Sequence, residues 1–181
     1  MKKRFFWPIV IALFAVLVYY NIFETPLAGA QYVEAELTNV AVDEEKTSVE
    51  AYLDSFEVED QRFGLYKFSG WAYQATGKVV QQREVFLILQ PVDEEGNVIE
   101  DEQQYSVPCG ELKARGDVEE RTDGISKPIP NTVGFENVVF SIRNIKDGNY
   151  RIYFQVVEDG VEETARTDIL VQIYDNQGTI I

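Results

Sequence analysis

The sequence predicts an all-β domain, an immunoglobulin-like β-sandwich of about seven strands, preceded by one N-terminal transmembrane helix. Stretches rich in β-branched and aromatic residues recur at spacings of roughly ten residues with turn signals between them, which is typical of all-β proteins. No segment after the N-terminus repeats its apolar residues with the helical period. A long apolar run near the start of the chain predicts the membrane helix.

The N-terminal apolar run is nearly long enough to cross a membrane as a helix. Residues 1–4 carry three basic side chains and form a cap, and residues 5–23 are 19 residues without a formal charge. At about 1.5 Å per residue, a helix of this length nearly spans a hydrocarbon core of roughly 30 Å. Trp7, Tyr19 and Tyr20 stand near the two ends of the run, where amphipathic aromatic side chains prefer to lie. We therefore expect a transmembrane helix or signal-anchor here.

The distribution of charge predicts the orientation of this segment. A basic cap stays in the cytoplasm, so the rest of the chain is expected to be extracytoplasmic at the cell membrane. Without the cap, 13 basic residues face 31 acidic ones, a net charge of −18. Ala28, Gly29 and Ala30 also fit a signal-peptide cleavage site, and cleavage near Ala30 would make the protein secreted. The run is longer than a usual signal core, which favours the uncleaved anchor.

The remaining chain divides into a tether and a folded domain. Residues 24–47 are expected to form the tether, and the domain is expected over residues 48–181. Strands are predicted over residues 48–58, 62–74, 83–92, 98–107, 134–145, 150–157 and 165–175. Residues 93–97 are a turn, so the strands on either side should pair as a hairpin. Residues 109–133 are the least regular stretch.

The clearest strand lies between two turn signals, Lys-Asp-Gly and Glu-Asp-Gly. Its even-numbered residues form one apolar face: Tyr150, Ile152, Phe154 and Val156. Its odd-numbered residues form the other face: Arg151, Tyr153, Gln155 and Val157. The even-numbered face is therefore expected to point into the core.

Composition excludes several classes of function. The formal net charge of −15 argues against nucleic acid as a partner, because phosphate binding needs a basic surface. The chain has no histidine, which removes Ser-His-Asp and Cys-His nucleophiles and histidine-based metal sites. The single cysteine, Cys109, has no partner for an internal disulfide and no histidine to activate its thiol. The sequence therefore predicts no enzyme activity, no catalytic residue and no cofactor.

The acidic clusters are expected to be solvated surface, because charge runs usually are. Loop carboxylates are ligands that Ca²⁺ prefers. The segment "DEEGN" at residues 93–97, however, places its glycine fourth rather than sixth and lacks the glutamate that completes an EF-hand loop. Paired carboxylates also hydrolyse glycosides, but carboxylates are too common here to single out a pair.

Trp71 is the only tryptophan after the N-terminal segment. In a regular strand, Trp71 and Tyr73 share a face with Ser69 and Lys67, whose small or polar side chains indicate an outward face. There the two rings would stack against a sugar. A bulge at Gly70 would reverse this phase. Burial in the core is the favoured alternative, because large aromatic residues dominate small cores and a central sandwich strand commonly carries a buried tryptophan.

Residues 113–124 mix basic and acidic side chains. Arg115 is suited to receive a carboxylate or a phosphate, and local ion pairs at the surface explain the same pattern. The Arg-Gly-Asp tripeptide that begins at Arg115 is short enough to occur by chance. If a sugar binds, we expect Trp71 and Tyr73 to stack against it and Arg115 and Asp117 to supply polar contacts.

Four short motifs carry a resemblance to a known class of domain. They are Gly-Trp-Ala at 70–72, Arg-x-Asp-Val at 115–118, Gly-Phe at 134–135 and Asp-Gly-x-Tyr-Arg-Ile at 147–152. In this order they resemble the small extracytoplasmic β-sandwich domains of bacterial envelope proteins, which accompany membrane proteins that assemble surface polysaccharides. The resemblance implies an accessory, non-catalytic role and supplies no catalytic residue.

We therefore expect a non-enzymatic, membrane-anchored binding module at the bacterial cell envelope, with a glycopolymer as its partner. The alternative is a structural subunit that docks to a membrane protein complex through its anchor, a sheet face or an edge strand. In both cases the N-terminal helix holds the protein to the membrane.

Overall fold

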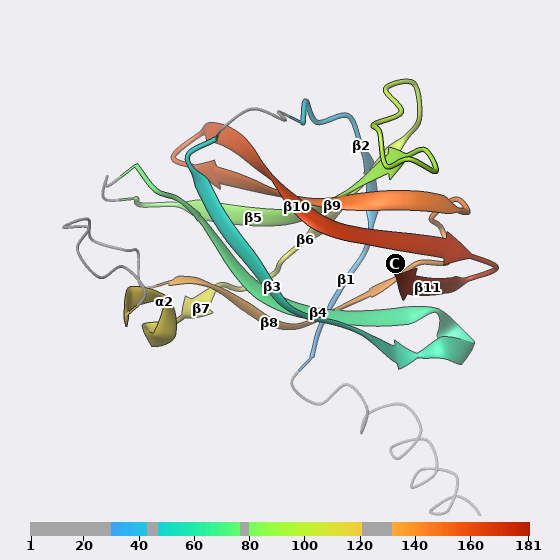
Figure 1. Cartoon of the computed structure of the whole chain (residues 1–181). Coiled ribbons are helices and arrows are strands. Elements are labelled where there is room, and N and C mark those ends of the chain that lie inside the picture. The colour runs from blue at the N-terminus through green and yellow to red at the C-terminus, as the bar shows by residue number, and fades with distance from the viewer. Residues whose placement is uncertain (1–29, 43–46, 77–79, 121–131) are drawn as a thin grey trace, which may run out of the picture. The chain divides into compact units, whose positions relative to one another are not determined.

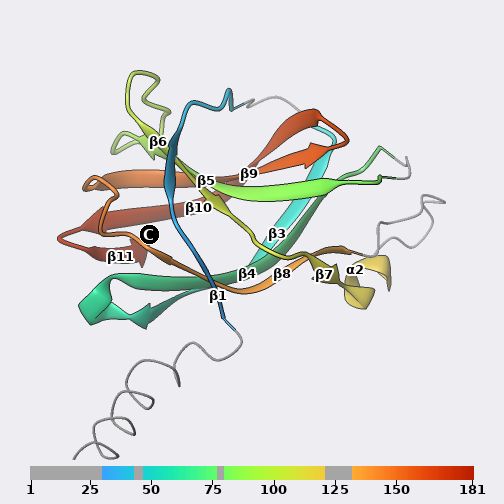
Figure 2. The same ribbon diagram turned by 180° about the vertical axis from the view of Figure 1, so that it is seen from behind.

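The computed structural model shows two β-sheets packed face to face (Figures 1 and 2). It describes residues 30–42, 47–76, 80–120 and 132–181. The first sheet has the spatial order β1 (Gln31–Val33), β8 (Thr132–Ser141), β4 (Leu65–Gln74) and β3 (Val49–Asp60), and β7 (Lys113–Ala114) also pairs with β8. The second sheet has the order β11 (Gln177–Ile180), β10 (Val161–Tyr174), β9 (Gly148–Glu158), β5 (Arg83–Val92), β6 (Gln104–Pro108) and β2 (Glu36–Thr38). The helical elements in the described ranges are a 3-10 turn, η1 (Gln61–Phe63), and α2 (Gly116–Glu120).

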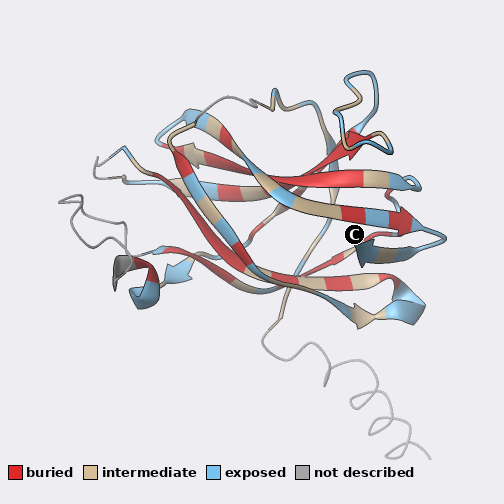
Figure 3. Ribbon diagram, in the orientation of Figure 1, coloured by how far each residue is buried: buried red, intermediate tan, exposed pale blue. Residues whose placement is uncertain are grey.

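The main core lies between the two sheets, where buried residues line both (Figure 3). The even-numbered residues of β9 point into it, as the alternation predicts, and Phe154 is fully buried. Its ring centroid lies 5.5 Å from that of Phe135 on β8, so the contact crosses from one sheet to the other. Burying one such side chain stabilises the fold by about 1.5–3 kcal/mol.

The prediction of an all-β domain is confirmed, but the described chain forms eleven strands rather than about seven. The predicted turn between β9 and β10 is present, with positive φ at Asp159 and Gly160. A second turn of this kind, at Asp175 and Asn176, has φ of 49° and 58° and returns the chain as β11. Two-residue turns with positive φ match the twist of a hairpin. The sequence prediction ended its last strand at residue 175 and missed β11.

The folded unit begins at Gln31, so the boundary predicted at residue 48 is too late. β1 pairs in parallel with β8 of the first sheet, and β2 pairs antiparallel with β6 of the second, so the chain changes sheet between Val33 and Glu36. The predicted tether is therefore wrong for residues 31–38. Strands of three residues are too short for their periodicity to be recognised.

The predicted membrane segment, residues 5–23, and its basic cap lie outside the described residues, as do Ala28 and Gly29 of the alternative cleavage site. In the ranges that the structure does describe, no helix has the length and apolar character needed to cross a membrane.

A buried ion pair links the two sheets at one end. Arg83 Nε on β5 donates to Glu158 Oε1 on β9 at 2.6 Å, and both side chains are 4% exposed. Arg83 Nη1 also donates to Thr132 O of β8 at 2.8 Å. Glu158 Oε1 also accepts from Gln74 N of β4 at 3.1 Å. Because β5 and β9 belong to the second sheet and β8 and β4 to the first, the pair holds both sheets together.

Replacing Arg83 with methionine leaves Glu158 as an uncompensated buried charge. We expect the free energy of unfolding to fall by about 3–5 kcal/mol. Urea denaturation of the purified full chain, followed by circular dichroism, measures this. Lys113→Met is the control, since the Lys113–Glu136 pair has side chains 45% and 46% exposed and should contribute about 1 kcal/mol or less. Similar small effects of both substitutions would contradict a linking role.

Candidate functional site

Trp71 and Tyr73 lie on the outer face of the first sheet, yet both are buried. Trp71 is 8% exposed and Tyr73 is 4% exposed. Phe68 and Ala72 of the same strand face the main core, so β4 keeps the alternation of a regular strand. Register shifts occur beside Gly70 on both neighbouring strands, but they do not reverse the faces. Trp71 is therefore neither in the core between the sheets nor an open platform.

A short helix covers these two rings. Trp71 and Tyr73 form a second apolar cluster with Val133 of β8 and Val118 of α2, and Val118 is 2% exposed. On the other side of Trp71, the ring of Tyr52 from β3 stacks at a centroid distance of 6.4 Å. The favoured prediction for Trp71, burial in the core between the sheets, is wrong: the residue is buried, but on the outward face. The cover was not predicted, because residues 109–133 show no periodic pattern in the sequence.

Arg115 and Asp117 lie in the same region but bond to one another. Arg115 Nε and Nη2 donate to Asp117 at 2.8 and 2.7 Å, and Nη1 donates to Asp54 Oδ2 at 2.6 Å. The hydrogen bonds to Asp117 and Asp54 raise the pKa of Arg115 above its usual value. The four predicted site residues are thus brought together around α2, with the predicted polar pair engaged in local ion pairs.

The hydroxyl of Tyr73 donates to Glu50 Oε2 on β3 at 2.7 Å. Burial raises the pKa of Tyr73, and the neighbouring Glu50 carboxylate adds to this effect. The hydroxyl therefore remains a donor throughout the physiological range. This bond holds one end of the aromatic cluster to the edge strand.

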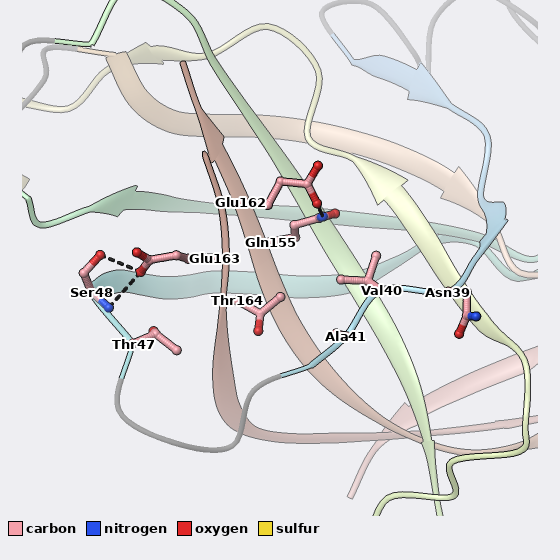
Figure 4. A pocket seen from close by; sticks show the side chains of 9 residues that line it. All are labelled: Asn39, Val40, Ala41, Thr47, Ser48, Gln155, Glu162, Glu163 and Thr164. Carbon is pink, nitrogen blue, oxygen red and sulfur yellow. Dashed lines mark hydrogen bonds between the residues drawn. The ribbon is translucent and has the colours of Figure 1, made fainter. Parts of the chain in front are cut away.

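Two adjoining hollows lie on the outer face of the second sheet. They share Asn39, Val40 and Ala41, which belong to a crossing segment of residues 39–42 that we call the strap. The first hollow, of about 590 Å³, is also lined by Thr47, Ser48, Gln155, Glu162, Glu163 and Thr164 (Figure 4). The second, of about 630 Å³, is also lined by Val42, Gln90, Glu95, Gly96, Asn97, Val98, Glu100, Gln104, Arg151 and Arg166. Both volumes fall in the range of roughly 300–1,000 Å³ that is typical of small-molecule sites.

Polar side chains are buried at these hollows. Gln90, Gln104, Gln155 and Arg151 are between 1% and 8% exposed, and they come from β5, β6 and β9. Arg151 Nη2 donates to Gly96 O at 3.0 Å. Arg151 Nε has no hydrogen-bond partner in the described part of the chain. Most buried polar atoms in proteins are paired, so an unpaired guanidinium nitrogen beside a hollow is a notable exception.

The first hollow has an acidic wall. Gln155 Nε2 donates to Glu162 Oε2 at 3.1 Å, and Ser48 donates to Glu163 Oε2 from its backbone nitrogen at 2.9 Å and its hydroxyl at 2.5 Å (Figure 4). Each carboxylate keeps further lone pairs for other donors. The wall therefore presents acceptors, while Arg151 and Arg166 belong to the second hollow.

Gln104 holds the strap in place between the hollows. Val40 N donates to Gln104 Oε1 at 2.8 Å, and Gln104 Nε2 donates to Val40 O at 2.9 Å. Gln104 Nε2 also donates to Gln90 Oε1. One side-chain amide thus pairs with the strap backbone as a neighbouring strand would. The shape of both hollows depends on this contact.

The sequence prediction missed this surface. It separated Arg151 and Gln155 from the core-facing residues of β9, and the structure confirms that separation. An arginine and a glutamine on one face of an otherwise apolar strand were the available signal. The strap falls within the predicted tether, so the sequence did not indicate what would lie over the face of β9 that carries Arg151 and Gln155.

The structure also places Cys109 and the acidic turn. Cys109 is fully buried, and burial raises the pKa of its thiol well above the usual value, which disfavours the reactive thiolate. Within the described ranges, no group of three or more acidic or cysteine side chains is placed to hold a metal ion. Asp93 accepts from Asn97 N at 2.7 Å and Nδ2 at 2.9 Å, which closes the predicted turn and lowers the pKa of Asp93.

Comparison with known proteins finds no match for this chain. The chain matches no protein-family model, no curated protein and no solved structure. The hollows and the aromatic cluster are therefore interpreted from their own residues.

Gln104→Ala should release the strap. Because Val40 and Gln90 lose their partner, we expect the free energy of unfolding to fall by about 1–3 kcal/mol. Amide hydrogen exchange in residues 39–42 should quicken by roughly tenfold or more. Mass spectrometry of the full chain measures the exchange. Gln172→Ala is the control, since this exposed amide donates to Asn149 on the neighbouring strand. Unchanged exchange in the strap would show that Gln104 does not hold it.

Proposed function

We propose that this protein is a non-enzymatic, membrane-anchored accessory module whose β-domain lies outside the cytoplasm of a bacterial cell and binds a glycopolymer of the envelope. Residues 5–23 are the proposed anchor, with the N-terminus in the cytoplasm. The apolar run and its basic cap support this orientation. A secreted form cleaved near Ala30 is the alternative. The two packed sheets are proposed to be an immunoglobulin-like sandwich.

The main observation in favour of binding is the burial of polar side chains at the two hollows. A sheet face that meets only water leaves its side chains exposed, whereas Gln155 and Arg151 are each 7% exposed beside a hollow. Sugar hydroxyls both donate and accept hydrogen bonds. They therefore complement a surface on which amides, carboxylates and guanidinium groups lie close together.

The charge of the protein favours a neutral glycopolymer. The formal net charge is −15, and glutamates line both hollows: Glu162 and Glu163 in the first, Glu95 and Glu100 in the second. A polymer of the same sign would be repelled as it approaches. We therefore expect neutral sugars or N-acetylated amino sugars rather than uronic acids.

Affinity electrophoresis of the full chain in detergent micelles tests this function. Native gels would contain dextran, a soluble β-glucan or glycol chitin, with polygalacturonate as the acidic comparison. We expect at least one neutral polymer to retard the protein, and Arg151→Gln and Gln155→Ala to reduce the retardation at least threefold with unchanged circular dichroism, because each removes a donor at a hollow. Lys113→Gln is the control.

Two outcomes would contradict the proposal. If none of the neutral polymers retards the protein, neutral glycopolymers are not its ligands. Equal retardation of the native chain and the Arg151→Gln and Gln155→Ala variants would show that the polymer binds elsewhere.

The alternative function, docking to a membrane protein complex, is favoured by the edge of the first sheet. β3 spans 12 residues and pairs only with β4 among the described strands. Tyr52 and Val58 on this strand are 53% and 52% exposed. An open edge of this length is a template for an added strand from a partner.

Photocrosslinking in cells separates this alternative from polymer binding. A benzoylphenylalanine at Val58 on β3 should crosslink to a membrane protein, because a strand added to this edge would bring the partner within reach. The same group at Val161 on β10, which is 54% exposed, is the control. Crosslinks at neither position, or equally at both, would contradict docking at β3.

A further inference from the structure

Three aromatic rings form a row on the outer face of the first sheet. Tyr52 of β3 stands opposite Trp71 of β4, with ring centroids 6.4 Å apart and planes inclined by 26°. Tyr73 follows at 5.9 Å from Trp71, with planes inclined by 32°. We call these three residues the aromatic row. Tyr52 is 53% exposed, while the other two are buried, so the row begins at the surface and continues under a cover.

The described cover is small. Val118 of α2 is the helix residue in the cluster with Trp71 and Tyr73. α2 spans only five residues, which is too short for a helix to be stable by itself. Among the described residues, Val118 and those that lead into α2 hold it in position.

Arg115 fixes the start of this cover. It bonds to Asp117 in the first turn of α2 and to Asp54 on β3, and its Nη1 lies 3.5 Å from Gly70 O. Its stem runs across Gly134, where a Cβ would stand 2.3 Å from Arg115 Cγ. The carboxylate side chains of Asp54 and Asp117 are 34% and 52% exposed. Arg115 is 15% exposed, but the half-exposed carboxylate of Asp117 is open to water, which can replace the guanidinium as its partner when α2 moves.

A second observation concerns the indole N–H of Trp71. Its indole Nε1 is buried and has no hydrogen-bond acceptor in the described part of the chain. Buried indole N–H groups normally find a partner, and leaving one unpaired is unfavourable. Moving the cover away would allow this N–H to donate to water or to a ligand. The closed arrangement therefore carries a cost that an open arrangement relieves.

We propose that the aromatic row is a stacking site for a neutral pyranose ring and that α2 is its displaceable cover. The C–H face of a pyranose packs on aromatic rings. Glu50, which bonds to Tyr73, and Asp54, which shares β3 with Tyr52, supply carboxylates that accept from ring hydroxyls, and Trp71 Nε1 donates to a ring or hydroxyl oxygen. This site lies on the sheet opposite the two hollows, so it extends beyond the proposed function and stands without it.

Tryptophan fluorescence of the full chain in detergent micelles tests the cover. A Trp7→Phe background leaves Trp71 as the only tryptophan. In this background we expect blue-shifted emission and weak quenching by acrylamide. Val118→Ser and, separately, Arg115→Gln should shift the emission to the red and increase the quenching constant severalfold, with unchanged circular dichroism. Val161→Ser and Arg62→Gln are the matched controls, since both side chains are exposed and neither belongs to the cluster of Trp71 and Tyr73.

Sugar titration then tests the site itself, with maltohexaose, cellohexaose and chitohexaose as probes. At least one should bind the Val118→Ser or Arg115→Gln variant tenfold or more tighter than the native chain, because no binding energy is spent on moving the cover. Tyr52→Ala added to the same variant should abolish this gain. Arg151→Gln should leave it unchanged, which separates this site from the hollows.

Two results would overturn the proposal. If both cover variants fold and leave Trp71 as protected as in the native chain, α2 is not a displaceable cover. If Trp71 becomes exposed but none of the three oligosaccharides gains affinity, the aromatic row is not a stacking site for pyranoses.

Discussion

The alignment of the two sheets at one end depends on the buried pair of Arg83 and Glu158. Backbone ladders hold each sheet together internally. Between the sheets, apolar contacts such as Phe135 against Phe154 supply most of the stabilisation, but the hydrophobic effect has no direction and sets no alignment. The hydrogen bonds from Arg83 to Thr132 and from Gln74 to Glu158 are directional. They fix how β4 and β8 lie over β9 and β5 at this end.

Both sheets also bury part of their outer faces, and the two covers are built in the same way. On the second sheet the strap is held by the amide of Gln104, and on the first sheet α2 is held by the guanidinium of Arg115. Each cover is a short segment with little stability of its own, fixed by one side chain that makes several hydrogen bonds. Short, weakly held segments are where local opening occurs, and binding sites are commonly found beside them.

The sequence predicted the features that depend on local periodicity. The faces of β9 follow from alternation within one strand and agree with the structure. Alternation also offers an outward face for Trp71, but the favoured prediction, burial in the core between the sheets, is wrong. The sequence could not show what lies over an outer face, because that depends on distant residues: Val118 covers Trp71, and Gln104 holds Val40 from 64 positions away. β1 and β2 were missed because three residues show no readable period. The hollows were missed as a consequence. The strap follows directly after β2, so it too was placed in the predicted tether.

The change of sheet made by β1 and β2 determines how the domain would respond to mechanical load. A pull applied at Gln31 acts first on the ladder of β1 with β8, next on that of β2 with β6, and then on the contact between Val40 and Gln104. Each link is short, with three residue pairs in each ladder. Once these contacts are broken, residues 31–42 can extend to a contour length of about 40 Å. Separation of these short N-terminal pairings would therefore relieve the load on the longer strands of the two sheets.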